Sequence, residues 1–133
     1  MDGRIMSDDK PFGLSEIGQI AITVRDLPLA VAFYRDVLGM QLLFEAPNLA
    51  FFACGSVRLM LGPPESEELD HPSSIVYYKV ADIRAAHETL AQRGVRFIHE
   101  PRVVHRTDQY ELWMAFFHDP DENPIALMCE ISV

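Results

Sequence analysis

The chain contains one supersecondary pattern twice, and this repeat limits its possible folds more than any other feature. In residues 17–39 and again in residues 74–94, a short β-rich run is followed by an aspartate, a helical pattern and a glycine. Aspartate suits a helix N-cap because its carboxylate accepts hydrogen bonds from the free amides of the first turn, and glycine suits the left-handed stop at the C-terminal end. The sequence therefore predicts helices over about 28–38 and 83–93, each preceded by a strand.

Short apolar runs, bounded by Gly, Pro, Asn and Asp, follow each predicted helix and are typical of strands. In the first copy they cover residues 40–45, 49–53 and 57–61. In the second copy they cover residues 95–98, 103–106, 111–118 and 124–131. The repeat predicts an α+β fold of two βαβββ modules in tandem, whose curved mixed sheets surround a concave pocket.

The repeat also sets the expected boundaries. One domain is predicted, with an N-terminal tail or arm in residues 1–16, a first module in 17–62, an acidic, proline-rich linker in 63–72 and a second module in 73–133. A chain of 133 residues, 49% of them hydrophobic, is long enough to bury one core.

The charge balance argues against a nucleic-acid partner. The chain has 20 acidic residues and 11 Lys and Arg, for a net charge of −9. Affinity for nucleic acid depends on neutralising phosphates with basic side chains. No apolar run approaches the roughly 20 residues that span a bilayer, and residues 1–13 lack the apolar segment of a secretory signal. We therefore expect a cytoplasmic protein with no membrane partner.

Strand alternation assigns the side chains of four predicted strands to two faces. The face expected to pack against the helices carries Ile20, Ile22, Val24, Val57, Leu59, Leu61, Val76, Tyr78, Val80, Ile125, Leu127 and Cys129. The opposite, concave face carries Gln19, Ala21, Thr23, Arg58, Met60, Ile75, Tyr77, Lys79, Ala126, Met128 and Glu130.

The concave set mixes apolar side chains with a few polar ones, which is typical of a small-molecule site. Tyr77 offers a stacking surface, and Arg58 or Lys79 offers an anchor for an anion. The alternative is that these side chains only fill a core, with Arg58 and Glu130 paired near one end.

Five segments resemble the vicinal oxygen chelate superfamily, which contains glyoxalase I, extradiol dioxygenases, methylmalonyl-CoA epimerase, and fosfomycin and bleomycin resistance proteins. They are residues 20–27, 32–40, 80–83, 93–95 and 117–124. The resemblance implies the glyoxalase/bleomycin resistance fold. It also implies a homodimer, because sites in this family are commonly built between modules.

The resemblance further implies where a divalent metal would bind. Family enzymes use a His or Gln near the start of the first strand, a Glu in the fourth, a His in the fifth and a Glu in the eighth. These positions fall on Gln19, Met60, Ile75 and Ala126. Only Gln19 has a suitable donor, and a one-residue shift would bring in Leu61, Val76 and Leu127, which are also apolar. We therefore predict that the family's metal site is lost and that no cofactor binds there.

A different metal site is a weaker possibility on the second-module hairpin. His99, His105, Glu111 and His118 lie there, and His105 and Glu111 are expected to face each other across the turn. Cys54 and Cys129 lack metal-ligand spacing and are expected as buried free thiols.

The turn at residues 119–123 departs from the family pattern. Family members usually place Gly after the Asp-Pro-Asp segment, whereas this chain has Glu122. A positive φ costs a non-glycine residue about 1 kcal/mol, so we expect Asn123 to adopt the left-handed conformation instead.

Three functional hypotheses follow. The first is a metal-free protein that binds a small aromatic or amphipathic molecule. The second is a lyase, isomerase or dioxygenase that uses a rearranged metal site or acid–base groups such as Glu130, Tyr77 or Lys79. The third is an assembly module that packs on a partner chain. The apolar run containing Trp113, Met114, Phe116 and Phe117 should be covered on at least one face by the other module or by a second subunit.

Overall fold

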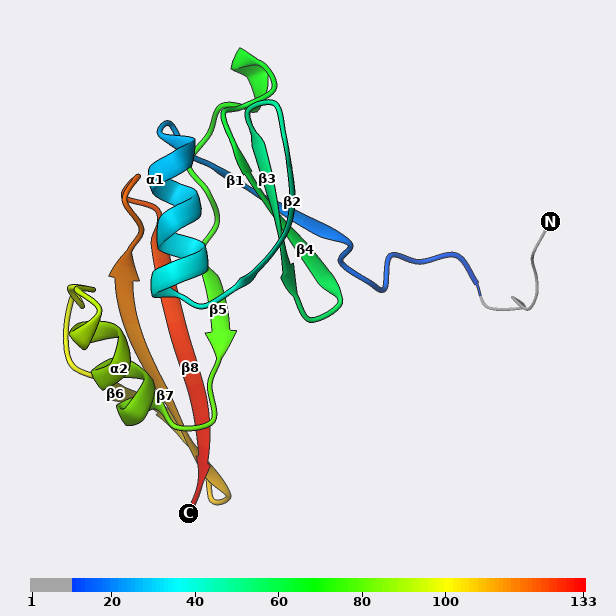
Figure 1. The fold of residues 1–133 in the computed structure, drawn as a ribbon. Helices are drawn as coiled ribbons and strands as arrows, with labels where there is room; N and C mark the ends of the chain where they lie inside the picture. The colour runs from blue at the N-terminus through cyan, green and yellow to red at the C-terminus, as the bar shows by residue number, and fades with distance from the viewer. Residues whose placement is uncertain (1–10) are drawn as a thin grey trace.

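Two four-stranded sheets, one from each repeat, frame the molecule in the computed structural model, which describes residues 11–133 (Figure 1). The first sheet has the order β1-β4-β3-β2 and contains β1 (Gln19–Thr23), β2 (Gln41–Ala46), β3 (Leu49–Cys54) and β4 (Val57–Gly62). The second has the order β5-β8-β7-β6 and contains β5 (Val76–Lys79), β6 (Arg102–Arg106), β7 (Tyr110–His118) and β8 (Pro124–Ser132). In each sheet the first strand pairs in parallel with the last, and the other pairs are antiparallel. The predicted tandem α+β fold is confirmed.

Each module carries one helix between its first two strands. Helix α1 (Leu27–Ala32) continues directly into a π-helical turn (Phe33–Val37), and α2 covers Ile83–Gln92. A short 3₁₀ turn, Glu67–Leu69, lies in the acidic linker. The described residues contain no helix that is long and apolar enough to cross a membrane.

The predicted helix signals act as expected. The carboxylate of Asp26 accepts a hydrogen bond from the amide of Leu29 at 3.2 Å, and that of Asp82 accepts one from the amide of Ala85 at 3.1 Å. Gly39 and Gly94 follow the helices with φ of +77° and +93°. Local chemistry alone therefore sets where each helix begins and ends.

The run 95–98 is the one predicted strand that is absent. Phe97 forms only an isolated bridge with Phe117, and the amide of Ile98 donates to the carbonyl of Phe116 at 2.8 Å. Beyond this point β6 occupies the same edge of β7, so the segment has no room to extend its pairing. The apolar residues of this segment serve packing rather than strand pairing, since the ring of Phe97 lies edge-on against that of Phe117 with ring centroids 5.1 Å apart.

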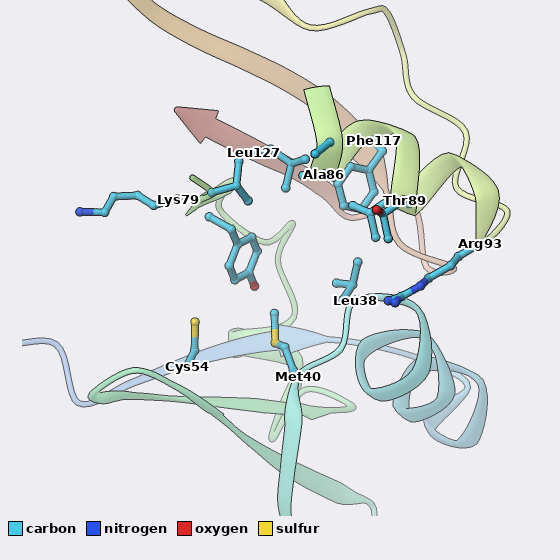
Figure 2. Close-up of a pocket in the computed structure, with 13 residues that line it drawn as sticks. Leu38, Met40, Cys54, Lys79, Ala86, Thr89, Arg93, Phe117 and Leu127 are labelled. Carbon is cyan, nitrogen blue, oxygen red and sulfur yellow. The ribbon is translucent and has the colours of Figure 1, made fainter. Parts of the chain in front are cut away.

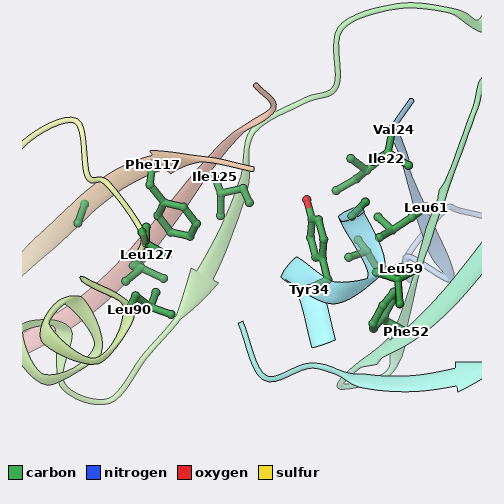
Figure 3. Packing of buried hydrophobic residues seen from close by; sticks show 14 of the residues in the cluster. Ile22, Val24, Tyr34, Phe52, Leu59, Leu61, Leu90, Phe117, Ile125 and Leu127 are labelled. Atoms are coloured by element: carbon green, nitrogen blue, oxygen red, sulfur yellow. The ribbon is translucent and has the colours of Figure 1, made fainter. Parts of the chain in front are cut away.

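The inner faces of both sheets share one hydrophobic core around α1. Tyr34 on this helical segment is fully buried and lies between apolar groups from the two sheets (Figure 3). The residues that alternation assigned to the helix side are buried or packed against this core, except for Val57, which is half-buried at the start of β4. Because Tyr34 contacts both modules, the two repeats are held together by a common core.

The turn at residues 119–123 corrects one prediction. Glu122, not Asn123, has the positive φ, at +68°. Asn123 instead uses its side-chain amide to donate to the carbonyl of Thr23 at 3.0 Å and to Oδ2 of Asp119 at 2.9 Å. These hydrogen bonds fix Asn123 in place, so the unfavourable conformation falls on Glu122.

The segment before β1 is irregular, although the carbonyl of Gly18 accepts a hydrogen bond from the amide of Arg58 in β4 at 3.0 Å. Residues 11–18 have no helix or strand, and the side chains of Phe12 and Leu14 are both 94% exposed. Residues 1–10 of the predicted arm lie outside the described part of the chain.

Cys54 and Cys129 are free thiols, the first half-buried and the second buried.

Candidate functional site

The outer face of the first sheet carries the first part of the predicted pocket. In the β1–β4 ladder Gln19 is paired with Arg58 and Ala21 with Met60, and partners in a ladder point to the same side of the sheet. Thr23 is paired with Gly62 at the end of β1, where its amide and carbonyl are bonded to Ser73 and Asn123. Thr23 therefore lies at the margin of this face.

The polar groups on this face are bonded to one another. The Nε of Arg58 donates to Oε1 of Gln19 at 2.8 Å, and Nε2 of Gln19 lies 3.7 Å from the sulfur of Met60. The guanidinium of Arg58 lies 5.0 Å from the centre of the Phe51 ring, which in turn stacks on Phe44 at 4.5 Å. The face thus combines a cation with a pair of stacked aromatic rings.

The outer face of the second sheet carries the other part of the predicted pocket. Tyr77 is paired with Ala126 and Lys79 with Met128 in the β5–β8 ladder. Phe116 of β7 is the other partner of Ala126, and its ring meets Tyr77 edge-on with centroids 5.8 Å apart. Ile75 lies just before β5 and is 42% exposed, and Glu130 is exposed near the end of β8.

Within one chain these two outer faces do not meet. The inner faces share the core around α1, with Tyr34 between them (Figure 3), so the outer faces turn away from that core on two different sides. The eleven predicted pocket residues therefore lie in two separate groups, one on each outer face, which we call the two half-sites of the predicted pocket. The alternative prediction paired Arg58 with Glu130. In the structure Arg58 donates to Gln19 on the first half-site, whereas Glu130 lies on the second.

The family's metal-ligand positions do not fit a divalent cation here. Met60, Ile75 and Ala126 have no suitable donor, and Ala126 is fully buried. The one oxygen, Oε1 of Gln19, already accepts a hydrogen bond from the Arg58 guanidinium, whose positive charge opposes a metal ion at that position. Nothing in this donor set supports metal chemistry at these positions.

The second-module hairpin corrects another prediction. Glu111 is paired with Arg106, and His105 with Leu112, so His105 and Glu111 do not face each other. One carboxylate oxygen of Glu111 accepts from Arg106 at 2.8 Å and the other from the indole of Trp113 at 3.2 Å. The Arg106 hydrogen bond and then the Trp113 one hold the pKa of Glu111 below its usual range. Among residues 11–133 no group of three or more His, Cys, Asp or Glu is arranged to hold a metal ion.

Sequence reasoning missed the aromatic residues of the outer faces, although the signal was present. In the ladders Phe51 pairs with Met60 on one side and with Phe44 on the other. Phe116 pairs with Ala126. Extending strand alternation to β3 and β7 would have found Phe51 and Phe116, whereas the bulge between Leu42 and Phe44 breaks the alternation of β2 and hides Phe44.

The comparisons with known proteins bear on this two-sheet fold. The family model of the Glyoxalase/Bleomycin resistance protein/Dioxygenase superfamily matches residues 16–127. The chain belongs to this superfamily. The match includes both modules, so the tandem arrangement is a property of the family as well as of this chain.

Individual relatives agree with this assignment. The uncharacterized protein YraH of Bacillus subtilis is 26% identical over 82% of this chain and 94% of its own length. The metallothiol transferase FosB of Staphylococcus haemolyticus is 33% identical, but over only 50% of this chain and 45% of FosB. TnmS3, an antibiotic binding protein from Streptomyces sp. CB03234, has the same fold, with a TM-score of 0.72 and 23% identity over 90% of this chain and 98% of TnmS3.

Proposed function

We propose that this protein binds a small aromatic or amphipathic molecule without a bound metal ion, and that it does so as a homodimer. The observation that carries the proposal is the set of side chains at the family's metal positions. Three of the four are Met60, Ile75 and Ala126, and the fourth, Gln19, is bonded to Arg58. What the outer faces offer instead is aromatic surface and positive charge, which suit binding better than Lewis-acid chemistry.

Each half-site supplies part of the recognition. Arg58, above the ring of Phe51, presents a cation that suits a carboxylate or another anionic group of the ligand. Tyr77 and Phe116, which meet edge-on, present ring surface on which an aromatic ligand can stack. The similarity to TnmS3 supports binding rather than turnover, because TnmS3 is an antibiotic binding protein.

The proposal of a dimer rests on the direction of the two half-sites. Since they turn away from each other within one chain, a closed pocket needs the first sheet of one copy and the second sheet of another. Apolar side chains on these sheets remain accessible, with Phe44 49% and Tyr77 42% exposed. Covering them with a second copy gives an association that is driven by apolar burial.

Metal content and ligand binding test the function. Untagged protein purified without a chelator is expected to contain no stoichiometric transition metal by elemental analysis. A panel of aromatic carboxylates and sulfonates is expected to yield compounds that raise the melting temperature in proportion to their affinity. Replacing Arg58 with Gln should weaken the binding of these compounds. R35Q is the control, because Arg35 is exposed and paired with Asp36, and it should leave their binding unchanged. One equivalent of metal per chain would overturn the proposal.

Subunit mixing tests the composite site. Met60→Trp blocks the first half-site and Met128→Trp blocks the second, so neither homodimer should bind. In a heterodimer of the two variants, one of the two sites pairs two unmodified faces. A statistical mixture should therefore regain about one quarter of the wild-type capacity. No recovery, or a monomer by light scattering at micromolar concentration, would contradict the composite site.

An enzyme is the second candidate, favoured by the 33% identity to FosB over half of this chain. It would be a lyase, isomerase or dioxygenase whose acid–base groups are Glu130, Tyr77 or Lys79 on the second half-site. Turnover of a bound compound that survives chelator treatment, and that is lost at E130Q, would favour this candidate over simple binding.

A further inference from the structure

A cavity lies between the modules, on the inner side of both sheets. It has a volume of about 440 Å³, which is within the range of ligand pockets. Leu38, Met40 and Cys54 of the first module form one wall, while Ala86, Thr89 and Leu127 of the second module form the other (Figure 2). Tyr78 also lines the cavity. It is separate from the outer half-sites, because Tyr78 points to the face of β5 opposite that of Tyr77.

The cavity walls are mainly apolar and contain one unsatisfied polar group. Met40, Leu127 and Phe117 give the cavity an apolar body. The hydroxyl of Tyr78 is buried and has no hydrogen-bond partner among the described residues. Burial, followed by the nearby Cys54 thiol, raises the pKa of Tyr78, so its hydroxyl stays protonated and available as a donor. Buried polar groups without a partner are rare, since each has lost its hydrogen bonds to water without replacing them.

The charged side chain beside the cavity is positive. It is that of Arg93, and no Asp or Glu is among the described residues that line the cavity. Lys79 also borders the cavity, but its side chain points away from it, on the outer face of β5 (Figure 2). The guanidinium of Arg93 also donates to the carbonyl of Val37 at 2.8 Å, which holds it beside the cavity. In a protein of net charge −9, a pocket with a cation and no acid favours an anion.

We propose that this intermodule cavity binds a small amphipathic anion. Its apolar ring system contacts Met40, Leu127 and Phe117, and its acceptor group takes the hydrogen bond that the Tyr78 hydroxyl offers. The anionic end is attracted by Arg93. This site does not depend on the outer half-sites, because it uses the inner side of the sheets.

The first test uses two probes that differ in one group. Anilinonaphthalene sulfonate has two aromatic units and a sulfonate, and N-phenyl-1-naphthylamine has the same aromatic units without the charge. Calorimetric titration of the Met60→Trp variant, whose outer half-site is blocked, should give one sulfonate probe per chain. The neutral probe should bind about 10-fold more weakly at low salt. Equal affinities, or no saturable binding, would overturn the proposal.

Adjacent tyrosines provide a matched pair of variants. Tyr78→Phe removes the inner hydroxyl and keeps the ring, and should weaken the sulfonate probe about 5- to 10-fold. Tyr77→Phe makes the same change on the outer face and should leave the affinity unchanged. A purely structural role for Tyr78 predicts no loss of probe affinity, because removing an unpartnered hydroxyl does not open the core.

Blocking variants separate this inference from the proposed function. Thr89 lies on the exposed surface of α2 at the cavity, so Thr89→Trp should abolish probe binding with little effect on the melting temperature. Met60→Trp on the outer face should leave it unchanged. Loss of the probe at M60W and retention at T89W would place it on the outer face, which overturns this inference while supporting the proposed function.

Discussion

The phenol of Tyr34 donates a 2.8 Å hydrogen bond to Oδ2 of Asp119, and thereby joins the first repeat to the turn of the second. Both residues are buried: Tyr34 is fully buried, and Asp119 is 3% exposed. Oδ1 of Asp119 accepts from the amides of Asp121 and Asn123 at 2.8 and 2.9 Å. One carboxylate therefore organises the turn and ties it to the π-helical turn that follows helix α1.

Replacing Tyr34 with Phe should lower the free energy of unfolding by about 1.5–3 kcal/mol, the usual range for a hydrogen bond to a charged group. Asp119 keeps its bonds from the turn amides, so the variant should still fold. Urea denaturation measures the change. The partly exposed Tyr77→Phe is the control and should change stability by less than about 0.5 kcal/mol. Equal stability of Y34F and wild type would show that the bond adds nothing.

The same tyrosine should make the protein sensitive to alkali. Burial first, and then the Asp119 carboxylate, raise the pKa of Tyr34 above its usual value of 10.0. Above about pH 10 the unfolded chain loses this proton while the folded chain keeps it, so stability is full below that pH and falls as the pH rises. The slope should be about 1.4 kcal/mol per pH unit for Tyr34. Denaturation between about pH 9 and 11.5 should show a shallower slope for Y34F, and an unchanged slope would contradict the assignment.

Replacing Glu122 with Gly should stabilise the protein. The φ of +68° is unfavourable for a residue with a Cβ, and relief of this strain exceeds the entropy cost of glycine in the unfolded chain. We expect a gain of about 0.5–1 kcal/mol, or a rise of about 2–4 °C in melting temperature. Asn48→Gly, at φ +63°, should gain less because Asn tolerates this conformation. Destabilisation at E122G would mean that the Glu side chain has a role of its own.

Replacing Gly62 with Ala should destabilise the first sheet. A Cβ at this position would lie 2.6 Å from Cδ2 of Leu49 and 2.7 Å from the carbonyl oxygen of Asn48, and the backbone oxygen cannot easily move away. The expected cost is about 1–3 kcal/mol by chemical denaturation. Gly18→Ala is the control, since a Cβ there meets nothing within 4 Å. Similar values for the two variants would contradict this account.

Much of the fold could be predicted because its signals are local. The aspartate caps and the glycine stops each act within a few residues, so the helices begin and end close to where the sequence indicates. The failed strand at residues 95–98 shows the limit. Its apolar residues serve tertiary packing against Phe117, and an apolar run alone does not reveal whether a sheet edge is free.

The candidate site was predictable in composition but not in assembly. Alternation places Gln19 with Met60 on one face and Tyr77 with Ala126 on another. The ladders agree, because Gln19 pairs with Arg58, Ala21 with Met60, and Tyr77 with Ala126. The hairpin error has a physical cause: a bulge between Val103 and His105 shifts the register, so that Arg106 rather than His105 meets Glu111. Bulges of this kind depend on the neighbouring strand and leave little trace in a single sequence.

By itself, the sequence determined the two strand–cap–helix units, the inner and outer face of each core strand and the lack of metal donors at Met60, Ile75 and Ala126. These depend on short-range hydrogen bonding and on the two-residue period of strands. Only the tertiary structure decided that both inner faces share one core around Tyr34, which turns the outer faces apart and leaves a cavity between the modules. That outcome depends on contacts such as Tyr34 with Asp119, between residues 85 positions apart. Such contacts depend on how whole modules pack together, and no local pattern encodes them.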